Sequence, residues 1–242
     1  MELQEVVSEI KKKENKKVVL TIYRDKKSKD YTVKKSSVQL DTVSYKMKEK
    51  KIGYIAVSQF LENTGDQFDR AVTALEKKGM KSLIIDLRDN GGGLLNTCTQ
   101  MVSRVIDKDK LIVYTKDKEG NKEEFKSDSG KTLDIPIIIL VNGNTASASE
   151  IMTGCLKDYG KATVVGTTTY GKGIVQNIMP LTDGSAIKFT IAKYYTPNGT
   201  DIHKKGIKPD VKVKMSDAQW KKAQTDEKAD KQLKKAIELL EK

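Results

Sequence analysis

Three short apolar runs constrain this chain most strongly, because each has the length and composition of a buried β-strand. They are SLIIDL at 82–87, IPIIILV at 135–141 and ATVV at 162–165. A strand that is covered on both faces is apolar throughout instead of alternating, which is typical of parallel sheets. Helical patterns follow the first two runs, and strands that alternate with helices favour an α/β fold. The fold class is therefore predicted to be α/β.

Hydrophobic periodicity predicts the elements around these runs. The expected helices cover 3–10, 65–78, 94–105, 147–158 and 226–240, and the expected strands cover 17–24, 31–38, 52–60, two stretches within 111–125 and two within 173–195. The first 38 residues read as a β-rich module with one short helix, and the pattern is helical from Ser216 onward. The predicted division is an N-terminal module at 1–43, a core at 44–215 and a helical extension at 216–242.

The composition narrows the class of protein. Apolar residues are 37% and charged residues 32% of the 242 residues, as in a soluble globular domain. No apolar run approaches the roughly 20 residues that a spanning helix needs, and the N-terminus lacks the apolar stretch of a signal peptide. The protein is thus either cytosolic or has an export segment outside this chain.

The formal net charge of +12 has an ordinary interpretation. Lysines are spread along the whole chain, and aromatic residues, at 6%, do not interleave with them as a base-stacking platform would require. This pattern favours a lysine-rich solvated surface, and no nucleic-acid partner is predicted.

The two cysteines do not suggest a catalytic or metal site. Cys98 and Cys155 lack the spacing of metal ligands and lie beside apolar residues in helical patterns, so buried free thiols are expected. A cysteine nucleophile needs a nearby histidine, and the only histidine is His203, in a turn-like segment. No metal and no cofactor are predicted.

The segment TASASE at 145–150 follows a buried strand and opens a predicted helix. Its central residue, Ser147, has two interpretations, and Thr145 and Ser149 offer competing hydroxyls. As the residue before a helix, Ser147 can serve as an N-cap, with Glu150 three residues later completing a capping box. A strand–turn–helix junction is also where nucleophile elbows lie. The segment alone leaves both interpretations open.

A serine nucleophile needs a base, and Lys172 has the most suitable surroundings in the sequence. A free lysine has a pKa of about 10.4, so only about one in 2,500 is neutral at pH 7, and burial is needed to lower that pKa. Lys172 lies among small and apolar residues in TTYGKGIV at 168–175, with no acidic residue near it in sequence. We therefore expect Lys172 to be buried. The stretch differs from a P-loop, which needs Ser or Thr after the lysine and then a helix.

A third chemical feature is the run Asn90-Gly91-Gly92-Gly93 at the end of the 82–87 strand. Consecutive glycines before a helix expose backbone N–H groups, and such donors are what an oxyanion needs. The run can equally be a tight turn. A dinucleotide loop is disfavoured because the second half of its motif, G-x-x-G, is absent.

These segments, in this order, resemble the C-terminal processing (tail-specific) peptidases. The matching pieces are DLRDNGGGL, VNGNTASASEI with LKDYGKATVVG, TYGKGIVQ, and LTDGSAIKFTIAKYYTPNGTDIHKKGIKPDVKV, and the resemblance covers about residues 1–215. It implies a serine endopeptidase with a Ser–Lys dyad on a crotonase-like α/β core. Members of this family cleave proteins near their C-termini, and most carry a PDZ domain and act outside the cytoplasm.

The resemblance also implies a role for each matching site residue. The nucleophile is Ser147, the general base is Lys172, and the partner that orients the base is Gln176. The oxyanion donors are the backbone N–H groups of Ala148 and of a glycine in the NGGG run, for which Gly92 is expected.

The N-terminal module departs from the family pattern. Residues 1–38 resemble only the last helix and the last two strands of a PDZ domain, so the chain is interpreted as a truncated or processed fragment. The implied partners are protein or peptide substrates with apolar C-termini, and a homodimer is left open. The implied location of the full-length protein is extracytoplasmic, periplasmic or at the cell surface, where a membrane anchor would hold it.

Two other functions stay open at this point. A catalytically inactive peptide-binding scaffold would share the fold but would not react with a serine-directed phosphonate. A crotonase-type acyl-CoA enzyme would share the oxyanion-hole architecture and would bind coenzyme A.

Overall fold

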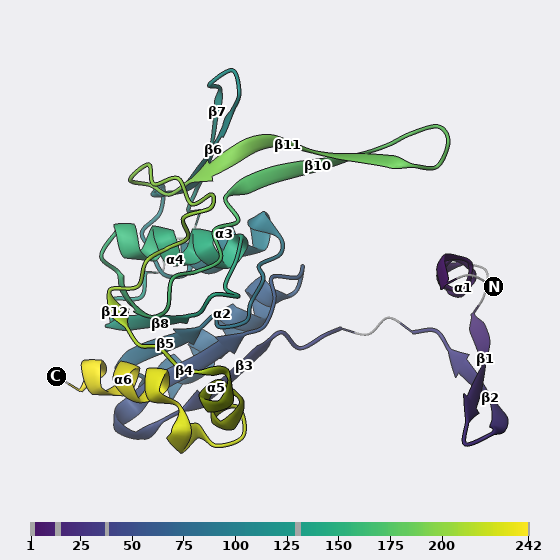
Figure 1. Ribbon diagram of the computed structural model, residues 1–242. Helices are drawn as coiled ribbons and strands as arrows, with labels where there is room; N and C mark the ends of the chain where they lie inside the picture. The colour runs from purple at the N-terminus through teal and green to yellow at the C-terminus, as the bar shows by residue number, and fades with distance from the viewer. Residues whose placement is uncertain (1–2, 13–15, 37–38, 129–131, 242) are drawn as a thin grey trace. The chain divides into compact units, whose positions relative to one another are not determined.

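The computed structural model describes residues 3–12, 16–36, 39–128 and 132–241 (Figure 1). The chain forms two compact units, Met1–Leu40 and Asp41–Lys242. The mixed α/β class predicted from the sequence is confirmed, and so is the β-rich character of the N-terminal module.

The N-terminal unit contains one helix, α1 (Leu3–Lys11), and a two-stranded antiparallel sheet of β1 (Lys17–Arg24) and β2 (Lys27–Lys34). The helix and the first strand lie where the sequence predicted them. The second strand begins earlier than predicted, because Asp25 and Lys26 alone reverse the chain, with φ angles of 51° and 58°. A two-residue turn with positive φ suits the twist of a β-hairpin. Positions 37 and 38 of the predicted strand lie outside the described residues.

The second unit is built on a six-stranded sheet, in the order β12-β9-β8-β5-β4-β3. The bounds are β3 Val43–Met47, β4 Ile52–Val57, β5 Ser82–Asp86, β8 Ile137–Val141, β9 Ala162–Gly166 and β12 Val211–Lys212. The edge strand β3 pairs antiparallel with β4, and the other neighbours pair parallel. The three apolar runs form β5, β8 and β9, side by side in the sheet. The short strands β3 and β12 were not predicted.

Helices cover both faces of this sheet (Figure 1). They are α2 Thr64–Lys77, α3 Leu95–Ser103 and α4 Ala148–Asp158 on one face, and α6 Lys231–Leu240 on the other. Successive side chains of a strand point to opposite faces. Ile85 accordingly packs in the core under the first three helices, whereas Ile84 packs with Leu233 of α6. Burial of apolar surface on both faces holds the three layers together.

The helical extension predicted at 216–242 consists of two helices, α5 (Asp217–Ala223) and α6, with a short 3-10 turn between them at Glu227–Ala229. The sequence predicted a helical pattern from Ser216 onward and a helix over 226–240. The helix α6 starts later, because the Asp230 carboxylate caps it by accepting a hydrogen bond from the Leu233 N–H at 2.9 Å.

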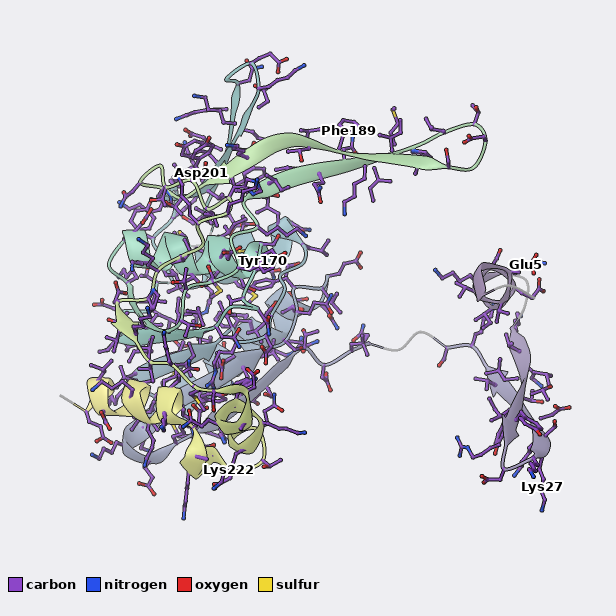
Figure 2. The ribbon with its side chains drawn as sticks, in the orientation of Figure 1. Glu5, Lys27, Tyr170, Phe189, Asp201 and Lys222 are labelled. Atoms are coloured by element: carbon purple, nitrogen blue, oxygen red, sulfur yellow. The ribbon has the colours of Figure 1, made fainter. Side chains whose placement is uncertain are left out.

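A second, four-stranded antiparallel sheet has the order β10-β11-β6-β7. Its strands are β6 Leu111–Asp117, β7 Lys122–Lys126, β10 Ile174–Pro180 and β11 Ala186–Tyr195. β11 pairs with β6 only from Ala192 to Tyr195, so the rest of the β10–β11 hairpin extends beyond β6 and β7 (Figure 1). Figure 2 shows Phe189 on this hairpin, and its side chain is exposed, as is that of Ile178.

Both cysteines are free and buried, as predicted. Burial raises the pKa of the Cys98 thiol to about 12, so this thiol is not a nucleophile at neutral pH. In the part of the chain that the structure describes, no helix is long and apolar enough to cross a membrane. Those residues also contain no group of three or more His, Cys, Asp or Glu that could hold a metal ion.

Candidate active site

Ser147 occupies the turn between β8 and α4 with an unusual backbone conformation. Its φ of 57° and ψ of −119° lie where residues with a side chain are rarely found. An ordinary N-cap residue has an extended backbone instead. The Ser147 N–H donates to the Glu150 carboxylate at 2.9 Å, so the contact expected from Glu150 is present. A strained strand-to-helix turn of this kind is the geometry of a nucleophile elbow, which presents its hydroxyl outward.

Three segments that are distant in sequence meet at one pocket of about 460 Å³. Ser147 comes from the turn before α4, Lys172 from the segment before β10, and Gly92 and Gly93 from the loop after β5. Asp89 also lines this pocket. The structure therefore brings together the serine, the lysine and the glycine run that the sequence singled out.

Lys172 is exposed, which differs from the buried lysine that the sequence predicted. Its neighbours Gly171 and Gly173 are buried, and a Cβ on Gly173 would lie 2.4 Å from the His203 nitrogen. The backbone at 171–173 is thus pressed against the turn that contains His203, while the lysine side chain extends into the open pocket. The small neighbours allow close packing of the backbone and do not bury the ammonium group.

Asn90 holds the glycine loop in place. Its side chain is fully buried, donates to the Val57 carbonyl at 2.8 Å and accepts from the Gly92 N–H at 2.9 Å. Gly92 has a φ of 95°, and a Cβ at this position would lie 2.7 Å from the Ala146 oxygen and 2.8 Å from the Ala148 nitrogen. The Gly92 N–H predicted to face an oxyanion is therefore already engaged by Asn90. Only glycine fits at position 92 in this conformation.

The next glycine presents its amide differently. Gly93 forms a parallel bridge with Phe60, in which the Phe60 N–H donates to the Gly92 carbonyl at 3.1 Å and the Leu94 N–H donates to the Phe60 carbonyl at 2.8 Å. In a parallel bridge of this kind, Phe60 bonds to the residues before and after Gly93 and not to Gly93. The N–H of Gly93 itself therefore points away from Phe60. Gly93 lines the pocket with Ser147, and its N–H is the more available donor.

The hydroxyls that compete with Ser147 are engaged inside the protein. Thr145 is buried and its Oγ1 donates to the Leu87 carbonyl at 2.8 Å, and the buried Ser149 Oγ donates to the Asn90 carbonyl at 3.0 Å. Both hydroxyls are therefore bound to the loop after β5, and Ser147 is the one of the three that lines the pocket.

Two other side chains for which a catalytic role was examined, those of Gln176 and His203, do not line this pocket. Gln176 is exposed on β10, at a β-bulge after Val175, and is absent from the described residues that line the pocket. His203 lies in a turn, as predicted, and its Nδ1 is buried without a hydrogen-bond partner among the described residues. A histidine that acts as a base needs a group that orients its ring.

A buried ionic cluster that the sequence did not predict joins the helical extension to the end of β5. Arg88 donates to Asp86 through Nη2 at 2.5 Å and to Asp230 through Nη1 at 3.0 Å, and these three side chains are almost fully buried. Burial disfavours the charged guanidinium, but the hydrogen bonds and the charges of Asp86 and Asp230 outweigh it and raise the pKa of Arg88. The Trp220 ring lies 4.5 Å from the guanidinium carbon. The extension therefore supports the residues that lead into the glycine loop.

Asp89 connects this cluster to the pocket. Its carboxylate accepts hydrogen bonds from Asn142 at 2.7 Å, Asn144 at 2.8 Å and the Trp220 indole N–H at 2.9 Å. Partial burial favours the neutral acid, but these hydrogen bonds and the nearby Arg88 outweigh it and lower the pKa of Asp89. The ionised carboxylate is thus part of the structure around the pocket at neutral pH.

Replacing Trp220 with phenylalanine is expected to reduce the free energy of unfolding at pH 7 by about 1 kcal/mol, because the ring over Arg88 is kept and one hydrogen bond to a partly exposed carboxylate is lost. A lowered folded-state pKa contributes stability above the unfolded-state pKa, about 3.9 for aspartate, and this contribution is lost as pH falls. The difference between variant and wild type should therefore shrink between pH 7 and pH 3 in urea unfolding. A difference that does not change with pH would contradict this role of the indole.

Comparison with known proteins shows that the chain is similar to peptidases. Residues 51–213, more than half of the chain, match peptidase family S41. The chain is 43% identical over 213 residues to the probable CtpA-like serine protease of Staphylococcus aureus (strain N315), covering 87% of this chain and 43% of that protein. It is 40% identical over 218 residues to the carboxy-terminal processing protease CtpA of Bacillus subtilis (strain 168), covering 90% and 47%. The chain thus spans less than half the length of these relatives.

Solved structures share the fold. The photosystem II D1 C-terminal processing protease superimposes with a TM-score of 0.67 at 29% identity, covering 81% of this chain and 55% of that chain. The tricorn protease has a TM-score of 0.51 at 20% identity and covers 78% of this chain, a likeness that concerns the fold alone.

Proposed function

Because the chain belongs to peptidase family S41, we propose that it performs the chemistry of a serine endopeptidase, with Ser147 as nucleophile and Lys172 as general base. The observation that carries the proposal is the strained Ser147 at a pocket shared with Lys172 and the glycine loop. The proposed substrates are proteins with apolar C-termini, cleaved near those ends. The description of the Bacillus subtilis relative as a carboxy-terminal processing protease supports this substrate class.

In the proposed reaction, Ser147 Oγ attacks the scissile carbonyl carbon while Nζ of a neutral Lys172 takes the hydroxyl proton. The developing oxyanion accepts hydrogen bonds from the backbone N–H groups of Ala148 and a glycine. We propose Gly93 as this second donor in place of Gly92, whose N–H donates to Asn90. Lys172 then passes its proton to the leaving amine as the C–N bond breaks. Water hydrolyses the acyl-enzyme, again with Lys172 as base.

Gln176 is the proposed partner that orients Lys172. The two residues lie at the base of the β10–β11 hairpin, and a β-bulge separates Val175 from Gln176. Bulges re-aim side chains next to active sites. Because Gln176 is exposed, its amide is free to approach the Lys172 amine when a substrate fills the pocket.

The proposal extends to the architecture and location of the full-length protein. The order helix, strand, strand in α1, β1 and β2 supports our interpretation of the N-terminal unit as the last part of a PDZ domain. A crotonase-like topology for the second unit, an extracytoplasmic location, a membrane anchor and a homodimer are proposed from the family resemblance.

One observation favours a second candidate function. Lys172 is exposed in this structure, and a base on an open pocket wall lacks the apolar surroundings that neutralise an amine. The same fold could therefore act as an inactive peptide-binding scaffold. Reactivity of the serine separates the two functions, because a scaffold needs no activated hydroxyl.

The experiment is reaction with a fluorophosphonate, followed by intact-mass measurement and peptide mapping. We expect a single adduct on Ser147, none in Ser147→Ala, and an adduct in the matched variant Ser149→Ala, since the Ser149 hydroxyl is engaged by Asn90. Cleavage of an unstructured protein should disappear in Ser147→Ala alone. A folded wild-type chain that forms no adduct would favour the scaffold, and labelling of another serine would overturn the assignment of Ser147.

A further inference from the structure

We infer that Glu150 is a positioning residue, which binds the nucleophile segment and the base segment to one buried carboxylate and thereby sets their mutual geometry. This inference rests on the proposed function of Ser147 and Lys172. Glu150 has no exposed surface, so it does not touch a substrate, and it acts through the backbone of the two reactive residues.

The carboxylate of Glu150 accepts four hydrogen bonds from two separate segments. Oε2 accepts from the Ser147 N–H at 2.9 Å and from the Lys172 N–H at 2.8 Å. Oε1 accepts from the Gly171 N–H at 2.7 Å and from the Thr169 hydroxyl at 2.5 Å. A single oxygen atom thus receives the backbone N–H groups of both proposed catalytic residues.

This arrangement exceeds the needs of a helix cap. A capping box requires only the bond from Glu150 to the N-cap N–H, here that of Ser147. The other three donors belong to the segment at 169–172, about 20 positions later in the chain, and contribute nothing to the start of α4. Hydrogen bonds to an ionised acceptor are stronger than neutral ones, and a buried carboxylate with several donors is held rigidly. We therefore assign to Glu150 the joining of two segments.

The bond to Ser147 explains how its conformation persists. A serine with φ of 57° carries backbone strain, which the surroundings must offset. The Ser147 N–H donates to the buried Glu150 carboxylate, so relaxation to an ordinary N-cap would leave this N–H without its charged acceptor. The same bond therefore holds the Ser147 hydroxyl at the pocket and the Ala148 N–H at the first turn of α4.

The bond to Lys172 fixes the origin of a side chain that is otherwise exposed. Lys172 reaches the pocket through four methylene groups, so the position of its backbone decides where the amine can lie. Glu150 anchors the N–H groups of Gly171 and Lys172 together. Placement of reacting groups within about 1 Å can change a rate on the order of 100-fold. Loss of this anchor should consequently affect the rate of reaction more than substrate binding.

The test compares Glu150→Gln with an intermediate variant and a control variant of the same unit. The amide of glutamine offers one acceptor oxygen, and its NH2 group would face N–H donors. Thr169→Val is the intermediate case, because it removes one of the four donors to Glu150, and the acceptor of the Ile207 N–H at 2.7 Å, but keeps the three backbone donors of Glu150. The control, Thr153→Val, removes a buried hydroxyl on α4 that donates to the Ser149 carbonyl at 2.7 Å and is not one of the four donors to Glu150. Each variant is measured for Tm, for kcat and KM, and for the rate of fluorophosphonate labelling of Ser147.

We expect Glu150→Gln to lower kcat and the labelling rate by at least about 30-fold, with KM within about threefold of wild type. Thr153→Val should lose Tm but keep kcat within about threefold, and Thr169→Val should lower kcat less than Glu150→Gln does. A loss of activity that follows the loss of Tm in all three variants would overturn the inference, because Glu150 would then be merely structural. If Glu150→Gln does not fold, Glu150→Asp decides, since its shorter carboxylate cannot reach both segments, and an unchanged kcat in that variant also overturns it.

Failure of the proposed function is recognised separately. A wild-type chain that neither cleaves nor labels would refute the peptidase proposal, whereas a reactive wild type with an equally reactive Glu150→Gln would refute only the role of Glu150.

Discussion

Replacing Lys172 with arginine is expected to abolish cleavage, with kcat lowered by at least about 1,000-fold in a protein that remains folded. A guanidinium group does not deprotonate in a protein, so it cannot accept the proton of Ser147. Lys172 is exposed and lines an open pocket, so the arginine side chain fits without disturbing the core. The loss would therefore come from chemistry and not from packing. The measurement is kcat on an unstructured protein, alongside Tm.

The matched control for this change is Lys205→Arg. Lys205 is also exposed and lies on the turn against which the Lys172 segment packs, but it does not line the pocket with Ser147. Its replacement should leave kcat unchanged, and Lys172→Ala should be as inactive as Lys172→Arg. Appreciable activity in Lys172→Arg would exclude Lys172 as the base.

Replacing Gly92 with alanine is expected to lower kcat on the order of 100-fold or more. The new Cβ would lie 2.8 Å from the Ser147 Cβ and 2.7 Å from the Ala146 oxygen, and the φ of 95° disfavours any side chain. Relief of these contacts must move either the glycine loop or the nucleophile segment, and so displaces the N–H of Gly93 or of Ala148, the proposed oxyanion donors. Loss of one such donor typically lowers kcat 100-fold or more. The measurement is kcat, together with the rate of phosphonate labelling.

Gly91→Ala provides the control for position 92. A Cβ on Gly91 would meet no atom within 4 Å, and its φ is not in the left-handed region. We expect this neighbouring substitution to change kcat by no more than about threefold. Equal losses at both positions would show that the loop tolerates no side chain anywhere, and would remove the specific role of the Gly92 contacts with Ser147.

The layers of the core were predictable because burial on both faces leaves a continuous apolar run in the sequence. SLIIDL, IPIIILV and ATVV became β5, β8 and β9 for this reason. The edge strands β3 and β12 were missed, because short strands at an edge owe their pairing to a neighbour and carry little pattern of their own. The start of β2 was misplaced because two residues with positive φ replaced a longer predicted turn.

The candidate site was predictable as a set of residues and not as a geometry. Local chemistry indicated Lys172 and the NGGG run and left two interpretations of Ser147 open, and the family resemblance then implied Ser147 and Gly92. The structure places these residues at one pocket. Lys172 was expected to be buried because its neighbours are small. The glycines on either side instead let the backbone at 171–173 pack tightly against the turn at 203–206, and the Lys172 side chain is exposed.

Contacts between distant segments carried no signal in the sequence. Arg88 and Asp230 are far apart in the chain, and neither lies in a motif that predicts their ion pair. The sequence around Asn90 did not indicate that its side chain would accept a hydrogen bond from the Gly92 N–H. Its place three residues after Ser147 explained Glu150 fully as part of a helix cap. The sequence therefore did not predict its hydrogen bonds with the segment at 169–172.

The sequence by itself determined the α/β class, the candidate site residues and the turns in which they lie, because these depend on short-range pattern and on residue type. Only the tertiary structure decided which N–H groups are free, which side chains are exposed and which segments share a carboxylate. The physical reason is that a hydrogen-bond donor or a charge takes its state from whatever group lies within about 3 Å, and in a folded chain that group is often supplied from far along the sequence.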